Sequence, residues 1–152
     1  EIWHGLSKKQ QGRYNHTYCE AGLRVGAYQD ITRFIEKSQK YHFDEQLVLF
    51  WSKLPYNLNH RLKVAEKWLI QHPNKPSVLL CNAKLHLAKK NWDKAESLLL
   101  ELLKIAPSAE VHQMLGLIYQ EQNQGIQALD HYKASLTPSN QSIQVIEDKS
   151  SE

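Results

Sequence analysis

The side chains best suited to chemistry in this 152-residue chain are histidines and cysteines. His16 and Cys19 stand three residues apart, so on a helix they would share one face and could together ligate a metal ion or a haem iron. The alternative is a half-exposed histidine beside a cysteine that packs in the core, and the pattern favours this alternative. We therefore expect no metal site, and haem binding through His16 is kept as an alternative hypothesis.

His112 and His131 form a second candidate pair, because they fall on successive helices of one sequence repeat and are expected to be neighbours. Their contact could be pH-sensitive, although ordinary packing is the simpler interpretation. The sequence contains no nucleophile elbow, no phosphate-binding glycine loop and no HExxH motif. It therefore predicts a protein that is not an enzyme.

Composition indicates a soluble and largely helical domain. Apolar residues make up 41% of the chain and charged residues 23%, with only six glycines and five prolines. No apolar run approaches the roughly 18 to 20 residues of a membrane-spanning helix. Cys19 and Cys81 form no CxxC motif and are expected to be buried free thiols, which favours a reducing compartment. Because the chain opens at Glu1 without a leader, we expect an excised domain whose N-terminal region is missing.

Charge is unevenly distributed along the chain. Residues 1–75 carry 12 Lys and Arg against 7 Asp and Glu, whereas residues 76–152 carry 7 against 9. The basic half could face an anionic surface such as a membrane leaflet or an acidic protein, or its charges could simply solvate helix faces. Nucleic acid is disfavoured as a partner, because the basic residues are dispersed rather than clustered with aromatic residues.

Helical periodicity runs through nearly the whole chain and repeats at a spacing near 34 residues. In KNWDKAESLLLELLKIAP, from Lys90 to Pro107, Asn91 is a suitable N-cap and the proline ends the helix. Equivalent positions, separated by 34, 30 and 33 residues, are Ile31, Ala65, Ala95 and Ala128. A further apolar helix is expected before each of them, over residues 14–24, 45–53, 77–89 and 109–122.

The last of these units shows the order L-G-x-x-Y followed by alanine, which is typical of tetratricopeptide (TPR) repeats. Its small residues, Gly116 and Ala128, would let two helices approach closely while larger side chains fill the space beside them. The predicted fold is all-α, a TPR-like right-handed superhelical solenoid of about four helix–turn–helix repeats. The repeats are expected at residues 13–40, 44–73, 76–107 and 109–137, in a single domain over residues 1–137, and residues 138–152 are expected to form a polar, disordered tail.

Longer stretches are more specific than a generic TPR pattern, above all the AEKWL-x-x-HP junction that begins at Ala65 and the KKNWDKA segment that begins at Lys89. Nearly the whole of residues 1–137 resembles the C-terminal TPR region of the HemY family. These are bacterial inner-membrane proteins encoded among tetrapyrrole-synthesis genes. The resemblance implies two transmembrane helices N-terminal to this region, and a role in late haem synthesis as a membrane-tethered scaffold or regulator of enzymes. It places the full-length protein in the inner membrane, with this domain expected on the cytoplasmic face.

The function expected from this resemblance is non-catalytic protein–protein interaction with haem-synthesis enzymes, without a resident cofactor. The alternatives are a haem- or tetrapyrrole-binding module and a TPR adaptor unrelated to haem. In TPR stacks the first helix of each repeat lines the inner groove, which would suit an extended or helical peptide with apolar anchors. The candidate groove residues are Arg13, His16, Glu20, Arg24, Leu47, Phe50, Leu80, Lys84, Glu110, Gln113 and Gln120.

Overall fold

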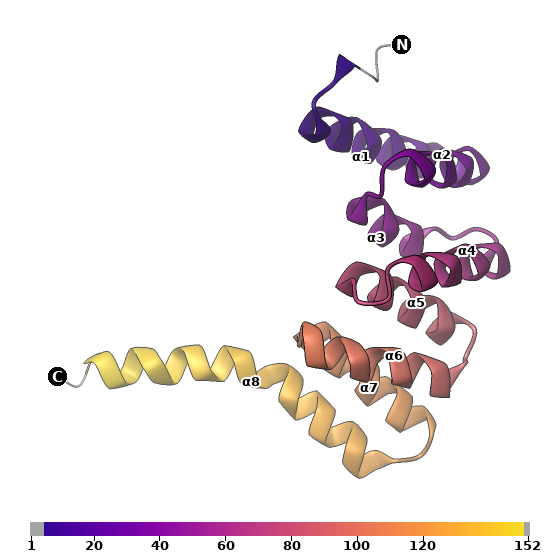
Figure 1. Ribbon diagram of the computed structural model, residues 1–152. Coiled ribbons are helices and arrows are strands. Elements are labelled where there is room, and N and C mark those ends of the chain that lie inside the picture. Colours follow the sequence, from indigo (N-terminus) through magenta and orange to yellow (C-terminus); the bar gives the residue numbers. More distant parts are fainter. Residues whose placement is uncertain (1–4, 151–152) are drawn as a thin grey trace. The chain divides into compact units, whose positions relative to one another are not determined.

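The computed structural model describes the backbone of residues 5–150 and the side chains of residues 5–137. This part of the chain contains eight α-helices and no strand (Figure 1), so the all-α prediction is confirmed. The helices are α1 (Lys8–Val25), α2 (Tyr28–Tyr41), α3 (Glu45–Lys53), α4 (Leu58–Gln71), α5 (Pro76–Ala88), α6 (Trp92–Ile105), α7 (Ala109–Glu121) and α8 (Gly125–Ser150).

The chain divides into two compact units, residues 1–90 and residues 91–152, called unit 1 and unit 2 below. Unit 1 contains α1 to α5 and unit 2 contains α6 to α8. The division falls inside the third predicted repeat, between its two helices. The single domain over residues 1–137 therefore stays a prediction.

Polar side chains fix several of the helix starts. Ser7 and Gln10 form a capping box at α1: Ser7 Oγ accepts from the Gln10 amide at 3.3 Å, and the Ser7 amide donates to Gln10 Oε1 at 2.8 Å. This cap starts α1 at Lys8, earlier than the predicted repeat boundary at residue 13. Asn91 occupies the N-cap position of α6 as predicted, but its side chain makes no capping hydrogen bond.

Helices in unit 1 pack pairwise and onto the next pair. Within the pairs, α1 contacts α2 and α3 contacts α4; between the pairs, α1 contacts α3, α3 contacts α5, and α4 contacts α5. The central helix α3 is thus covered on two sides, and its Val48 and Trp51 side chains are fully buried. The core of unit 1 extends from Cys19 and Ile31 at one end to Val78 and Cys81 at the other.

A glycine opposite a bulky residue sets the helix spacing in two of the pairs. A methyl group at Gly22 would lie 2.7 Å from Ile31 Cγ1, and one at Gly116 would lie 2.6 Å from Tyr132 Cε1. Both distances are far below van der Waals contact, so only glycine allows these approaches without a shift of the neighbour. The first pair therefore accommodates Ile31 by placing glycine across from it.

Arg61 is buried, with 6% of its surface exposed, and its guanidinium binds backbone carbonyls at the end of α3. Its Nη1 donates to the Trp51 carbonyl at 3.0 Å and its Nε donates to the Tyr56 carbonyl at 2.6 Å. In return, Trp51 Nε1 donates to the Arg61 carbonyl at 2.9 Å. These bonds join α3, the connection after it and α4, and they satisfy carbonyls that a helix end leaves without partners.

Unit 2 is built on α7, which packs against both α6 and α8. The buried residues of unit 2 include Leu99 on α6 and Leu115 and Ile118 on α7. The backbone of α8 continues to Ser150, so helix extends into the segment expected to be a disordered tail. Pro138 is the only proline or glycine after residue 125, which leaves few breaks in that stretch. The side chains of residues 138–150, and residues 151–152 altogether, lie outside the described residues.

Replacing Arg61 with methionine should lower the free energy of unfolding by about 2–4 kcal/mol, because buried carbonyls lose a charged donor. Chemical denaturation followed by far-ultraviolet circular dichroism measures the change. The matched control is Arg33→Met, which removes an exposed arginine from α2 and should change the free energy by no more than about 0.5 kcal/mol. Equal losses for the two variants would contradict the role assigned to Arg61.

Candidate functional site

One face of α1 carries the four basic, imidazole and acidic residues predicted for the first part of the groove. Spacings of three, four and four residues keep Arg13, His16, Glu20 and Arg24 on one side of the helix. All four are exposed. His16 Nδ1 lies 3.7 Å from Glu20 Oε2, and both side chains are about half exposed, at 52% and 49%. The four residues are therefore accessible on one helix face, and their place in a groove stays a prediction.

The structure joins α1 to α3 through an aromatic contact at this face. The rings of His16 and Phe50 meet edge to face, with centroids 6.2 Å apart and planes at 81°. Phe50 is half-buried and accessible as expected. Leu47 was wrongly placed in the groove: it is 1% exposed and belongs to the core, because α3 is packed by both α1 and α5.

The remaining groove residues of unit 1 lie on α5, the helix that packs against α3. Leu80 and Lys84 are both half-buried, so part of each side chain reaches the surface. We call the exposed and half-buried residues of this region the partner face, and it is made of Arg13, His16, Glu20, Arg24, Phe50, Leu80 and Lys84. Two cations stand on α1 and one on α5, with aromatic and aliphatic side chains on α3 and α5.

Unit 2 contributes three predicted residues, all from α7. Glu110, Gln113 and Gln120 are exposed, and Leu117 between them is 42% exposed. They form a neutral-to-acidic helix face, as the sequence indicated. The structure brings them together with one another only, as a surface of unit 2 by itself.

His16 and Cys19 do not form a ligand pair. Cys19 is fully buried in the core while His16 faces outward, so the two side chains leave the helix in different environments. Burial raises the pKa of the Cys19 thiol to about 12, and the nearby Asp44 carboxylate adds to this effect. The thiolate that would bind iron is therefore strongly disfavoured, and the residues do not fit a haem held by this pair. Within the described residues, no group of three or more His, Cys, Asp or Glu is placed to hold a metal ion.

Both cysteines are free and buried, as the sequence predicted, and burial raises the pKa of Cys81 to about 12 as well. We expect Ellman's reagent to modify neither thiol in the native protein near neutral pH, because both are inaccessible and protonated. Both should react once the chain is unfolded in denaturant. Rapid native-state reaction of Cys19, followed by peptide mapping, would contradict its place in the core.

The two histidines expected to be neighbours are in contact in unit 2. His112 Nδ1 and His131 Nδ1 are 3.1 Å apart, so one ring donates its proton to the other. Tyr119 stacks on His131 with ring centroids 5.3 Å apart, and its hydroxyl donates to Glu96 Oε1 at 2.5 Å. This link to Glu96 could not be predicted from the sequence, because it joins two residues that are 23 positions apart and lie on different helices.

Electrostatics at this cluster favour the neutral form of His131. Burial is the main cause that lowers the pKa of His131, and the neighbouring His112 lowers it further. Asp130 and Glu96 act in the opposite direction but do not reverse the shift. The hydrogen bond to Glu96 raises the pKa of Tyr119 to about 12, so the phenol remains protonated at physiological pH.

The lowered pKa of His131 predicts a loss of stability in mild acid. As the pH falls below the ordinary histidine value of 6.5, the unfolded chain binds a proton at this residue before the folded chain does. The free energy of unfolding should therefore decrease until the pH passes the lower folded-state pKa. Thermal denaturation over a pH series measures this slope.

His131→Gln should flatten that slope, whereas His42→Gln, which removes an exposed histidine from unit 1, is the matched control and should keep it. An unchanged slope in His131→Gln would show that other groups cause the acid sensitivity.

Comparison with known proteins does not assign the site. No protein-family model matches the chain, and no curated protein matches it. Among the described residues, no helix is both long and apolar enough to cross a bilayer. Function is therefore inferred from the faces that the helices present.

Proposed function

We propose that this chain is a non-catalytic protein-interaction module whose partner binds at the partner face of unit 1. The observation that carries this proposal is the exposed row on α1, from Arg13 to Arg24, joined to α3 by the edge-to-face contact of His16 with Phe50. A row of charged side chains beside accessible apolar ones suits peptide binding. The charges set the orientation of the peptide, and the apolar side chains contact its apolar anchor residues.

A TPR-like, right-handed solenoid is the architecture that we propose for the helix pairs. In unit 1, the first helix of each pair contacts the first helix of the next, and α4 also contacts α5, as expected for stacked repeats. The close approaches at Gly22 and Gly116 support the same scheme, because TPR pairs depend on small residues where their helices meet. In such a stack, α1, α3 and α5 would line one concave surface.

The chemistry of the partner face favours a segment that is partly acidic and partly apolar. Arg13, Arg24 and Lys84 supply positive charge, and Glu20, which lies 3.7 Å from His16, is the one acidic residue of the partner face. Phe50 and Leu80 are half-buried, so each can be covered further by an incoming side chain. The expected ligand is an extended or helical peptide that places carboxylates near the arginines and an apolar residue near Phe50.

The resemblance to the HemY family suggests which proteins supply that peptide. We propose that the chain is the TPR region of a HemY-like protein of the bacterial inner membrane, on its cytoplasmic face, and that its partners are enzymes of late haem synthesis. The support is the sequence order of residues 1–137. The haem-binding alternative has less support, because Cys19 is buried away from His16.

The double variant Arg13→Glu and Arg24→Glu should lose most of its capture of a haem-synthesis enzyme from bacterial lysate, because the charge of the face is reversed. Its thermal stability should be unchanged, since both residues are exposed. The matched control is Lys53→Glu with Lys89→Glu, which reverses the same number of charges at exposed positions outside the partner face and should keep capture.

Mass spectrometry of the captured proteins decides between the outcomes. Capture of haem-synthesis enzymes by the wild type and the control alone supports the proposal. Equal capture by all three proteins would remove the partner face from consideration. Capture of envelope or secretion proteins instead would favour an adaptor unrelated to haem.

A further inference from the structure

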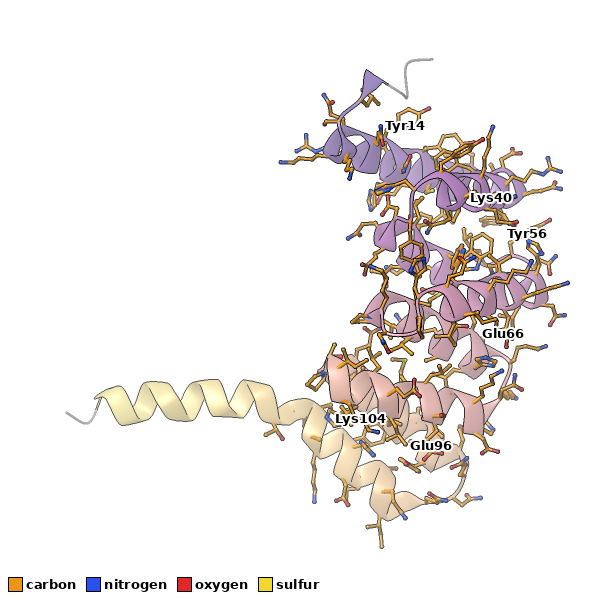
Figure 2. The ribbon with its side chains drawn as sticks, in the orientation of Figure 1. Tyr14, Lys40, Tyr56, Glu66, Glu96 and Lys104 are labelled. Atoms are coloured by element: carbon orange, nitrogen blue, oxygen red, sulfur yellow. The ribbon has the colours of Figure 1, made fainter. Side chains whose placement is uncertain are left out.

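A second surface of unit 1, on α2 and α4, is strongly basic. Arg33, Lys37 and Lys40 occupy one face of α2, and Lys63 and Lys67 occupy one face of α4; all five side chains are exposed. We call these five residues the basic face. A shift of 30 residues carries Arg33 onto Lys63 and Lys37 onto Lys67, so two successive helix pairs present cations at equivalent positions. Figure 2 shows Lys40 projecting from α2.

Carboxylates on the same two helices do not neutralise these cations. Glu36 on α2 is bound to His60 on α4, and Glu66 on α4 lies 3.4 Å from Nε2 of the buried His86. Among the residues whose side chains are described, no carboxylate lies within ion-pair distance of the basic face. Two of the three carboxylates of these helices therefore lie beside histidines, the third, Asp30, is exposed, and the side chains of the basic face are exposed as well.

The net charge of the two units differs in sign. Residues 1–90 carry 15 Lys and Arg against 7 Asp and Glu, a balance of +8. Residues 91–152 carry 4 against 9, a balance of −5. The second helix of the next pair, α6, mixes Asp93 and Glu101 with its lysines, so the basic face is a property of unit 1 alone.

Between α2 and α4 the basic face is hollowed. An open depression of about 410 Å³ lies between the helices, with Lys40 and Lys67 as its cationic lining and Val64 and Trp68 as its apolar lining. Glu36, Gln39 and Gln71 complete the lining. The bond between Glu36 and His60 spans the same two helices. A phosphate group could lie between the two ammonium groups while its attached carbon chain contacts the apolar lining.

Apolar side chains project at the C-terminal ends of both helices. Tyr41, the last residue of α2, is 75% exposed, and Ile70, the last but one of α4, is 81% exposed. A tyrosine with an apolar ring and a polar hydroxyl suits the boundary between headgroups and acyl chains. Two exposed apolar side chains beside a group of lysines suit shallow insertion into a bilayer better than they suit a protein interface, because a protein interface has a continuous apolar centre.

We propose that the basic face docks this unit on a bilayer surface containing anionic phospholipid. The five cations face the headgroups, a phosphate lies in the depression between Lys40 and Lys67, and Tyr41 with Ile70 enter the interfacial layer. Single-stranded nucleic acid is a poorer fit, since it needs aromatic side chains interleaved with the cations for base stacking, and Tyr41 is the one aromatic residue of α2 and α4 whose side chain is exposed.

Vesicle co-sedimentation tests this proposal on the 152-residue chain. The chain should bind vesicles that mix phosphatidylglycerol with phosphatidylcholine, should leave vesicles of phosphatidylcholine alone in solution, and should dissociate as salt is raised. Lys37→Gln, Lys40→Gln and Lys67→Gln together should weaken binding roughly 100-fold, since each cation near an anionic surface contributes about fivefold. Tyr41→Ser with Ile70→Ser should weaken binding while keeping its dependence on salt.

The matched control is Lys53→Gln, Lys89→Gln and Lys90→Gln, which removes the same charge from exposed positions outside the basic face. This control should lose far less affinity than the first triple variant. Equal losses would show that net charge alone attracts the chain, and equal binding to both kinds of vesicle would remove the lipid proposal. Absence of vesicle binding, together with binding of an acidic peptide to α2 and α4, would assign the basic face to a protein partner. Circular dichroism of each variant confirms that the helices are intact.

Discussion

Unit 1 depends on a buried cation, the guanidinium of Arg61, which binds backbone carbonyl groups instead of a carboxylate. Arg61 replaces its hydration with the carbonyl groups of Trp51 and Tyr56, where the dipole of α3 is negative. Burial lowers the pKa of its guanidinium, but an arginine starts from so high a value that it stays charged. The helix α3 has only nine residues and packs against both α1 and α5. The bonds from Arg61 that fix the end of α3 therefore also affect its packing against these two neighbours. The position of Phe50 beside His16 follows from that arrangement.

The helix pattern of this chain could be predicted because its information is local. Period, caps and prolines place α3 at the expected residues 45–53 and α7 within one residue of its expected end. Burial across the stack is less local. Leu47 has the spacing of a groove residue, yet its exposure depends on how closely α1 and α5 approach α3, which periodicity along one helix does not encode. The burial of Arg61 could not be predicted from the sequence either, because a buried arginine and a solvated one look alike in a basic sequence.

The partner face and the basic face of unit 1 lie on alternate helices. First helices carry charge in a row that includes both signs and borders Phe50 and Leu80, whereas α2 and α4 together carry six Lys and Arg against three Asp and Glu. A partner protein and a lipid surface could therefore be bound by one unit without competing for the same side chains. Histidines lie beside carboxylates in both arrangements: His16 lies beside Glu20 on one face, and His60 is bound to Glu36 at the depression lined by Lys40 and Lys67 on the other.

The close approaches at Gly22 and Gly116 also limit how this sequence can drift. In each pair, the helix separation is set by the sum of two side chains rather than by either one, with almost nothing on one helix and Ile31 or Tyr132 on the other. A larger side chain is tolerated on one helix only if a smaller side chain replaces its neighbour on the other helix. In homologous chains these positions should therefore change together, and a chain caught between two such states would carry either a void or a clash at the centre of the pair.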